Sequence, residues 1–394
     1  MSKLDQLIKE LCPDGVEFVE LKDIGFVSGA GVDKKINVNE KPVKLLNYMD
    51  VYRNNYIDNT LDFMEVTAND TKINQCNVKK GDIFITPTSE VLNDIGNSAV
   101  ITEDLPNVVY SYHIMRIRLK EISFVTSQYI GYAFKSNYVQ TQINKLAEGI
   151  TRYGLTKTKW EQVKFPLPPL PVQAEIVRIL DNFTELTAEL TAELTARKKQ
   201  YGYYTDKLMI FSDGVDMRTL NKIAEIGTGS SNTNQEVDDG EYPFYVRSQV
   251  IRRSNRFLFD ETAIVIPGEG GVGDIFHYVE GKYDLHQRAY RISFKDSCIK
   301  PKFAYYYLKN AFKRFIMTQA VTATVTSIRK PMIERFPIPV PPLAEQERIV
   351  SILDKFDALV NDISIGLPAE IEARQKQYEY YRDQLLTFKE LRDE

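Results

Sequence analysis

One segment of this chain occurs twice, which constrains the fold to two similar halves. Residues 168–186, PPLPVQAEIVRILDNFTEL, share Pro, Pro, Leu, Gln, Ile, Val, Ile, Leu, Asp, Phe and Leu in register with residues 341–359, PPLAEQERIVSILDKFDAL. Residues 196–209 match residues 373–386 in the same way, after four additional residues in the second copy. The order is therefore block, helix, block, helix, which predicts a pseudo-twofold protein.

Both copies predict long helices. Apolar residues recur every three or four positions, and tyrosine and leucine resume the stripe further along each copy. Such a stripe is typical of two long helices that pack on each other, and we expect an antiparallel coiled coil. The proline-rich stretches FPLPPLP and FPIPVPP set a sharp start to each helix, and Gly366 with Pro368 predicts a kink in the second.

The first copy also contains Thr-Ala-Glu-Leu twice in succession, at 187–190 and 191–194. Leu, Ala and Glu are strong helix formers, so an isolated repeat of this kind is explained by solvent-facing helix that grew through duplication. The recurrence of the whole surrounding segment favours a functional explanation instead.

Two blocks of domain size alternate with the helices. They open alike, with DGVEFVELKDI and DGVDMRTLNKI, and continue with strand-like stretches such as KLLNYMDVY and TAIVIPGEG. We expect an α+β fold in which two globular β-rich blocks alternate with the two paired helices. Its parts are an N-terminal helical segment at 1–11, blocks at 12–164 and 212–335, and helical spacers at 165–211 and 336–394.

Composition fits a globular cytoplasmic protein. The 394 residues are 43% hydrophobic and 26% charged, with no run of about 18 apolar residues and no apolar block near the amino terminus. Cys12, Cys76 and Cys298 are odd in number and widely spaced, which argues against a disulfide framework and gives no metal-binding pattern.

The net charge of −4 is unevenly distributed. An acidic average usually counts against a nucleic-acid partner, because phosphate neutralisation favours basic proteins. Residues 12–164, however, hold 18 Lys and Arg against 19 Asp and Glu, and residues 212–335 hold 18 against 15. The blocks are near neutral or basic, and the acidity lies in the remaining segments.

Catalytic motifs are weak. Gly268, Gly270 and Gly273 satisfy G-x-G-x-x-G after a predicted strand, but strand-like sequence comes next where a cofactor loop needs a helix. The three histidines are too scattered for a zinc site. We therefore interpret the glycine string as a turn and expect no catalytic residues, no metal and a chain built to bind.

Polar and basic side chains cluster in both blocks. Arg bidentate to guanine, Asn or Gln to adenine, and Ser or Thr to phosphate are common DNA contacts. For any single residue a solvated turn is the simpler explanation, but the clusters favour DNA. The candidate DNA-binding residues are Tyr48, Tyr52, Arg53, Thr88, Ser89, Asn93, Arg152 and Lys157 in the first block, and Arg247, Ser248, Arg252, Arg253, His286, Gln287 and Arg288 in the second.

Taken over its full length, the chain resembles the specificity subunits of bacterial type I restriction-modification systems. The Thr-Ala-Glu-Leu repeat with ARKKQYGYY and RQKQYEYYRDQLLTFKE is similar to their type IC branch, although Val172-Gln173 departs from the more typical Glu345-Gln346. The resemblance implies that each block is a target-recognition domain reading half of a split double-stranded DNA target. It also implies two adenine methyltransferase subunits as partners, which restriction subunits can join. S-adenosylmethionine, ATP and magnesium would belong to those partners, and this chain would be non-catalytic.

The resemblance suggests a function for the Thr-Ala-Glu-Leu repeat. Four added helical residues lengthen a helix by about 6 Å and turn it about 40° beyond a full turn. One added base pair advances DNA by about 3.4 Å and turns it by roughly 35°. We hypothesise that helix length sets the spacing between the half-sites. The main alternative is a structural adaptor that scaffolds proteins without touching DNA, and an enzyme survives only through the glycine string.

Overall fold

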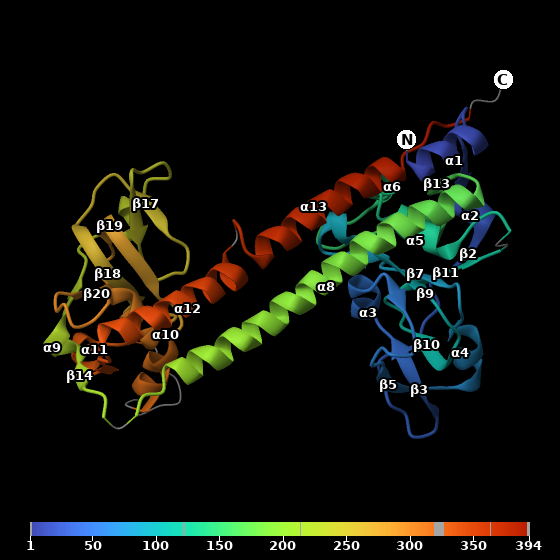
Figure 1. The fold of residues 1–394 in the computed structure, drawn as a ribbon. Coiled ribbons are helices and arrows are strands. Elements are labelled where there is room, and N and C mark those ends of the chain that lie inside the picture. The colour runs from blue at the N-terminus through green and yellow to red at the C-terminus, as the bar shows by residue number, and fades with distance from the viewer. Residues whose placement is uncertain (1, 121–122, 213, 319–326, 363, 392–394) are drawn as a thin grey trace. The chain divides into compact units, whose positions relative to one another are not determined.

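The computed structural model describes residues 2–120, 123–212, 214–318, 327–362 and 364–391. They form two compact units: Met1–Glu189 with Glu372–Glu394, and Leu190–Ile371. Both ends of the chain lie in the first unit (Figure 1). None of the helices in the described ranges combines the length and hydrophobicity that a bilayer-spanning segment needs.

Unit 1 is built around two sheets and two short ladders. The five-stranded sheet runs β2 (Gly25–Ser28), β11 (Met115–Leu119), β7 (Ile83–Ile85), β9 (Ser98–Ile101) and β4 (Tyr56–Ile57). The four-stranded sheet runs β5 (Met64–Ala68), β3 (Lys41–Leu46), β10 (Leu105–Tyr110) and β6 (Asn77–Val78). The ladders pair β1 (Glu17–Glu20) with β13 (Lys164–Leu167), and β8 (Thr88–Ser89) with β12 (Tyr153–Gly154).

The five-stranded sheet of unit 1 separates two hydrophobic cores. Ile83 and Ile85 face the core that includes the start of the long helix, whereas Phe84 between them faces the core of the four-stranded sheet. Side chains alternate across a strand, so a continuous apolar stretch such as IFI must be covered on both faces. The helices of this unit are α1 (Lys3–Leu11), α2 (Leu21–Ile24), α3 (Tyr48–Arg53), α4 (Asp70–Gln75), η1 (Leu92–Asp94), α5 (Ser127–Phe134), α6 (Asn137–Leu146) and α7 (Lys157–Glu161).

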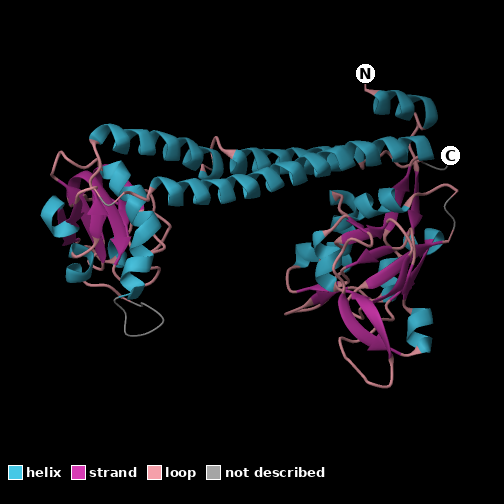
Figure 2. Cartoon of the chain, turned by 60° about the horizontal axis from the view of Figure 1, so that its bottom comes forward, coloured by secondary structure: helices cyan, strands magenta, loops and turns pink. Residues whose placement is uncertain are grey.

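Unit 2 contains one larger sheet with a helix packed on it. The strands run β15 (Ala224–Thr228), β20 (Ala289–Phe294), β18 (Phe259–Pro267), β19 (His277–Leu285), β16 (Tyr242–Tyr245) and β17 (Arg252–Ser254). A ladder pairs β14 (Met217–Thr219) with β21 (Pro337–Pro339). The shorter helices are α9 (Leu220–Ile223), η2 (Thr233–Gln235), α10 (Pro301–Thr318) and α11 (Lys330–Glu334). Figure 2 shows the strands of each unit gathered into sheets with helices beside them.

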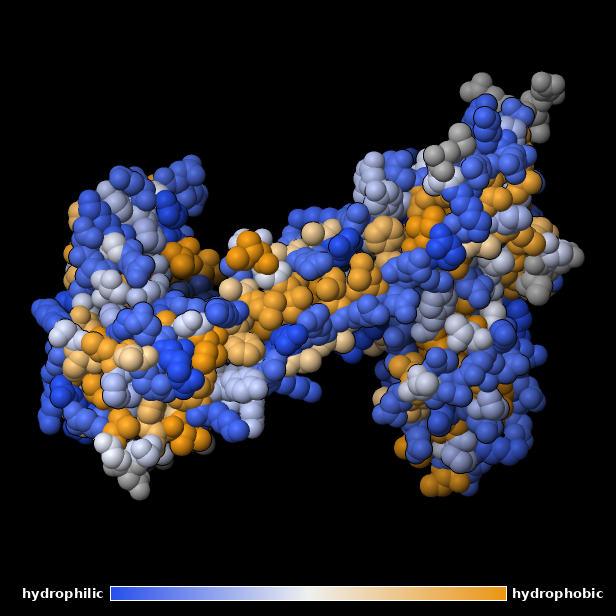
Figure 3. All heavy atoms as spheres, viewed as in Figure 1, coloured by the Kyte–Doolittle hydropathy of each residue, from blue (hydrophilic) through white to orange (hydrophobic). Residues whose placement is uncertain are grey.

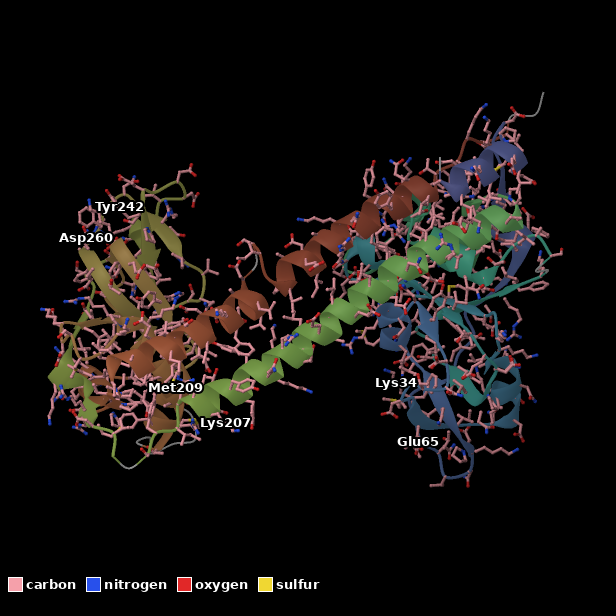
Figure 4. All side chains as sticks on the ribbon, viewed as in Figure 1. Lys34, Glu65, Lys207, Met209, Tyr242 and Asp260 are labelled. Atoms are coloured by element: carbon pink, nitrogen blue, oxygen red, sulfur yellow. The ribbon has the colours of Figure 1, made fainter. Side chains whose placement is uncertain are left out.

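The predicted helices form, and the second is broken in two. α8 (Leu170–Leu208) is continuous over 39 residues, with Lys207 near its carboxyl end and Met209 just beyond it (Figure 4). The second copy gives α12 (Leu343–Asn361) and α13 (Leu367–Leu385), so it ends and restarts where we expected a kink. A Cβ on Gly366 would meet the carbonyl oxygen of Ala358 at 2.5 Å, so the chain turns closely against the end of α12. Pro368 lies in the first turn of α13, where proline is tolerated.

The glutamine that the two copies share attaches each helix to its own unit through hydrogen bonds. Gln173 is fully buried, and its Nε2 donates to the carbonyl oxygens of Phe124 and Pro168 at 2.9 and 2.8 Å. The amide of Thr126 donates back to Oε1 over 3.0 Å. Gln346 is equally buried and makes the matching contacts in unit 2, with Cys298, Lys300 and Pro341.

The aspartate that the two copies share adds a further hydrogen bond between each helix and its unit. Asp181 accepts from the hydroxyl of Tyr132 at 2.6 Å, and Asp354 accepts from the hydroxyl of Tyr306 at 2.5 Å. Burial, followed by these carboxylates, raises the pKa of both tyrosines. The residues shared by the two copies therefore include the groups that attach a long helix to each domain. In Figure 3 hydrophobic side chains gather along α8, α12 and α13 on the face shown.

One strand-like prediction is wrong. KLLNYMDVY is extended only to the end of β3, and α3 begins at Tyr48. The main-chain amide of Asn47 donates to Oδ2 of Asp50 over 2.7 Å, half of a capping box that starts the helix. The Asn-x-x-Asp spacing outweighs the strand preference of the neighbouring apolar residues.

Candidate nucleic-acid interface

In unit 1 three of the predicted residues lie on α3: Tyr48, Tyr52 and Arg53. Tyr48 and Tyr52 lie one turn apart, and their rings stack with centroids 6.1 Å apart and an interplanar angle of 16°. Tyr52 is 40% exposed, and the carboxylate of Asp94 raises its pKa. Arg53 is exposed at the end of the same helix. α3 thus offers aromatic faces and a cation, which suit nucleobases and phosphates.

A short hairpin brings Arg152 beside the β8 ladder. β12 pairs antiparallel with β8, with Tyr153 opposite Ser89, and Nε of Arg152 donates to Oγ1 of Thr88 over 3.1 Å. Gly149 turns the chain at φ +137°, where a Cβ would meet the carbonyl oxygen of Arg152 at 1.9 Å. The β8–β12 ladder and the hydrogen bond from Arg152 to Thr88 therefore hold residues far apart in sequence together, and the turn before Arg152 requires glycine.

Further polar groups extend this region of unit 1. Asn93 lies on η1, where its Oδ1 accepts from Nδ2 of Asn144 over 3.0 Å. Burial lowers the pKa of His113, and the nearby cations Lys34 and Arg152 lower it further. His113 and Lys34 were not among the predicted residues, because nothing in their local sequence links them to Arg152.

In unit 2 a carboxylate joins two predicted arginines. Oε1 of Glu269 accepts from Nη1 of Arg288 over 2.7 Å and forms an ion pair with Nη1 of Arg247. The hydrogen bond from Arg288, and then the charges of both arginines, lower the pKa of Glu269. Nδ1 of His286 accepts from the main-chain amide of Arg288 over 3.0 Å. Burial and the neighbouring arginines keep the pKa of His286 low.

Three more predicted residues lie in the same part of unit 2. Arg252, on β17, pairs with Glu236, and its charge also acts on His286. Nε2 of Gln287 donates to Oδ1 of Asn232. Ser248 donates its hydroxyl to the carbonyl oxygen of Val250 over 2.9 Å, within its own turn. We name Arg247, Arg252 and Arg288 with Glu236 and Glu269 the arginine–carboxylate cluster.

Two predicted residues are engaged elsewhere. Lys157 lies on α7, where its Nζ is 3.6 Å from a carboxylate oxygen of Glu161. Arg253 donates from Nε and Nη2 to the carbonyl oxygens of Gly240 and Glu241, at 2.8 and 3.0 Å. Arg253 thus holds the turn before β16, which leaves its remaining N–H groups for an outside partner.

The sequence predicted the arginines of unit 2 but not their carboxylates. Glu269 lies in the glycine string interpreted as a turn, and the structure confirms a loop there, between β18 and β19. Its arginine partners are 22 residues earlier and 19 residues later in the chain. The strand order of the sheet brings them together.

Comparisons with known proteins identify the family of the chain. A family model described as type I restriction modification DNA specificity domain matches residues 13–197 and 212–373. The specificity subunit of type I restriction enzymes EcoR124I/EcoR124II of Escherichia coli is 36% identical over 286 residues, covering 64% of this chain and 70% of that one. A putative type I restriction enzyme specificity subunit of Haemophilus influenzae is 36% identical over 270 residues, covering 61% and 68%.

Solved structures share the fold at lower identity. The S subunit of a type I restriction-modification system from M. genitalium covers 94% of this chain and 96% of its own length, with 15% identity and a TM-score of 0.59. A chain from work on complex assembly and conformational transition of the type I R-M system gives 17% identity and a TM-score of 0.61, with coverage of 95% and 98%. With the matches to both halves of the sequence, these findings confirm the predicted family: the chain belongs to the DNA specificity subunits of type I restriction-modification systems.

Proposed function

We propose that this chain reads a DNA target in two halves, one with each unit, and organises two adenine methyltransferase subunits. The observation that carries the proposal is the presence of one polar, basic cluster on each unit, each unit being attached to a long helix by hydrogen bonds to the same buried Gln and the same Asp. A chain with two reading domains and two equivalent helix attachments suits a partner that is itself two-sided, as duplex DNA is.

In this proposal the chain does no chemistry. Methyl transfer, with S-adenosylmethionine, belongs to the methyltransferase subunits, and ATP and magnesium belong to restriction subunits where these join. The candidate residues recognise and position DNA in the cytoplasm. The type IC branch, to which the Thr-Ala-Glu-Leu repeat points, stays a prediction.

The proposal predicts DNA binding with a steep dependence on salt. Each phosphate contact releases counterions, so six contacts would lower the affinity by about 1,000-fold between 50 and 200 mM salt. A filter-binding series with the full chain and its methyltransferase measures this slope, and a methylation map of DNA from expressing cells gives the target. A two-part adenine-methylated motif is expected. A complex that assembles but neither binds nor methylates DNA would favour the structural adaptor.

Each unit also has a row of three aromatic rings in contact, which we call its aromatic ladder. Because the two rows match, we expect two equivalent partner sites. In unit 1 Phe183 stacks on Tyr381 at 5.5 Å and 23°, and Tyr381 meets Tyr380 edge-on at 5.4 Å and 76°. In unit 2 the equivalent ladder runs through Phe356, Tyr204 and Tyr203, at 5.7 Å and 25° and then 5.5 Å and 73°. The outermost rings, Tyr380 and Tyr203, are 62% and 56% exposed.

We expect each exposed tyrosine to anchor one methyltransferase subunit. Buried aromatic anchors commonly contribute about 2 kcal/mol or more to an interface, so Tyr203→Ala or Tyr380→Ala should weaken one of the two sites by about 30-fold. Analytical ultracentrifugation should then show one bound methyltransferase for each single variant and none for the double variant. Lys199→Ala, on the exposed surface of α8, is the control. Two methyltransferases bound to the double variant would place the interface elsewhere.

A further inference from the structure

The glycine string of unit 2, which the proposed function leaves without a role, positions one carboxylate. The main-chain amide of Gly268 donates to the carbonyl oxygen of Arg288 over 2.9 Å, and its own carbonyl accepts from Ile328 over 2.8 Å. A Cβ on Gly268 would meet the Arg288 carbonyl oxygen at 2.8 Å. This close approach fixes the start of the loop against the segment that carries Arg288, so Glu269 is held within the arginine–carboxylate cluster.

Within the described part of the chain, Glu269 is paired through one of its two carboxylate oxygens. Among the described residues, Arg247 and Arg288 donate to it, and both reach Oε1. Its side chain is 33% exposed, and those of Arg247 and Arg288 are 42% and 59% exposed. Oε2 therefore has lone pairs for a donor from outside the chain, while the two guanidinium groups keep further N–H donors.

A carboxylate at this place is unfavourable for a surface that only binds phosphates, because the negative charges of the carboxylate and the phosphates repel each other. It is favourable for a surface that reads base edges. In the major groove guanine offers the acceptors O6 and N7, for which Arg is the common partner, and cytosine offers the N4 amino donor, which Glu or Asp accepts. Adenine offers an N6 amino donor beside N7. One carboxylate between two arginines matches a base edge that mixes donors and acceptors.

We infer that Glu269 is a specificity-determining residue of the second half-site, and that its Oε2 accepts a hydrogen bond from the exocyclic amino group of a cytosine or adenine. Oε1 keeps Arg247 and Arg288 aimed at neighbouring acceptors. The carboxylate also repels phosphates, so it lowers the affinity for unrelated DNA relative to the target. The inference rests on the proposed function, since it assigns a base contact to the DNA-reading surface of unit 2.

The test compares Glu269→Ala and Glu269→Gln in the full chain, bound to its methyltransferase. For Glu269→Ala we expect the methylation map to become degenerate at one base pair of one half-site, with about tenfold less discrimination there. Binding to unrelated DNA should stay equal or tighten, with a salt slope steeper by about one unit. Glu269→Gln keeps the size of the side chain and should change the preferred base towards adenine, which an amide recognises.

Asp274→Asn is the matched control. Asp274 lies in the same loop and pairs with Lys313 at 2.6 Å, so this variant makes the same change of charge outside the cluster. It should leave the motif unchanged. An unaltered motif for both Glu269 variants, or an equal loss of binding to every DNA sequence, would overturn the inference. Failure of the unsubstituted chain to read any two-part motif would overturn the proposed function with it.

Discussion

Inserting a third Thr-Ala-Glu-Leu after Leu194 is expected to widen the unread gap of the methylated motif by one base pair and to end methylation at the original spacing. α8 is continuous through this point, so the insertion lengthens one helix by about 6 Å and rotates the remainder of that helix by about 40°. One base pair of DNA advances by about 3.4 Å and rotates by roughly 35°. The rotations nearly agree, and the difference in length must be taken up by the helices or the DNA.

The number of Thr-Ala-Glu-Leu copies can change because threonine hydroxyls of this segment are paired within the helix itself. At the start of the repeat and just after it, the hydroxyls of Thr187 and Thr195 each donate to the main-chain carbonyl four residues earlier, both at 2.9 Å. Leu190 and Leu194 are half-buried. An added Thr-Ala-Glu-Leu copy therefore leaves no buried polar group unpaired. It also keeps the leucines on nearly the same face of the helix.

The insertion needs a control that separates length from sequence. Replacing residues 191–194 by four alanines keeps the helix length, so the gap should stay as it is. Methylation maps of the three strains give the comparison, and circular dichroism checks that the helix content is retained. A folded, active insertion variant with an unchanged gap would contradict the hypothesis that helix length sets the spacing between the half-sites.

The repeat predicted the doubled architecture, but not how each copy is used. Gln173 and Gln346 appear in the alignment of the two copies as matched polar residues. Their burial could not be predicted, because two of the three groups that each glutamine binds come from 46 to 49 residues away, just before α5 and α10. Local periodicity marks the apolar face of a helix, whereas the partners of a buried amide depend on tertiary packing.

The candidate interface shows the same division. Residue type and clustering predicted Arg247, Arg252 and Arg288, since several of them lie close together in sequence. Glu269 was not among the predicted residues because its partners are distant in sequence. Lys157 was predicted from a basic stretch, and the sequence alone does not show that its lysine pairs with Glu161 on a helix. The partner of each charged group, which is local for Lys157 and distant for Arg247, therefore decides which N–H groups are left for DNA in the proposed function.

Gln173→Leu is expected to destabilise unit 1 by about 3–5 kcal/mol, because three main-chain groups that meet at this buried side chain lose their hydrogen-bond partner. These are the amide of Thr126 and the carbonyl oxygens of Phe124 and Pro168. The substitution conserves approximate size, so a lost cavity contact contributes little. Hydrogen exchange at Thr126, together with urea unfolding, measures the effect on unit 1.

Gln75→Leu is the matched control in the same unit, since Gln75 is exposed at the end of α4 and its replacement should change stability by less than about 0.5 kcal/mol. Gln346→Leu should produce the same loss in unit 2, where the amide of Lys300 and the carbonyl oxygens of Cys298 and Pro341 depend on it. If both buried glutamines behave like Gln75, packing of the apolar stripe alone holds each helix to its domain. If both substitutions lower stability by several kcal/mol, the glutamine shared by the two copies fixes each recognition domain to its helix. Such a fixed attachment is required if helix length is to set the spacing between the half-sites.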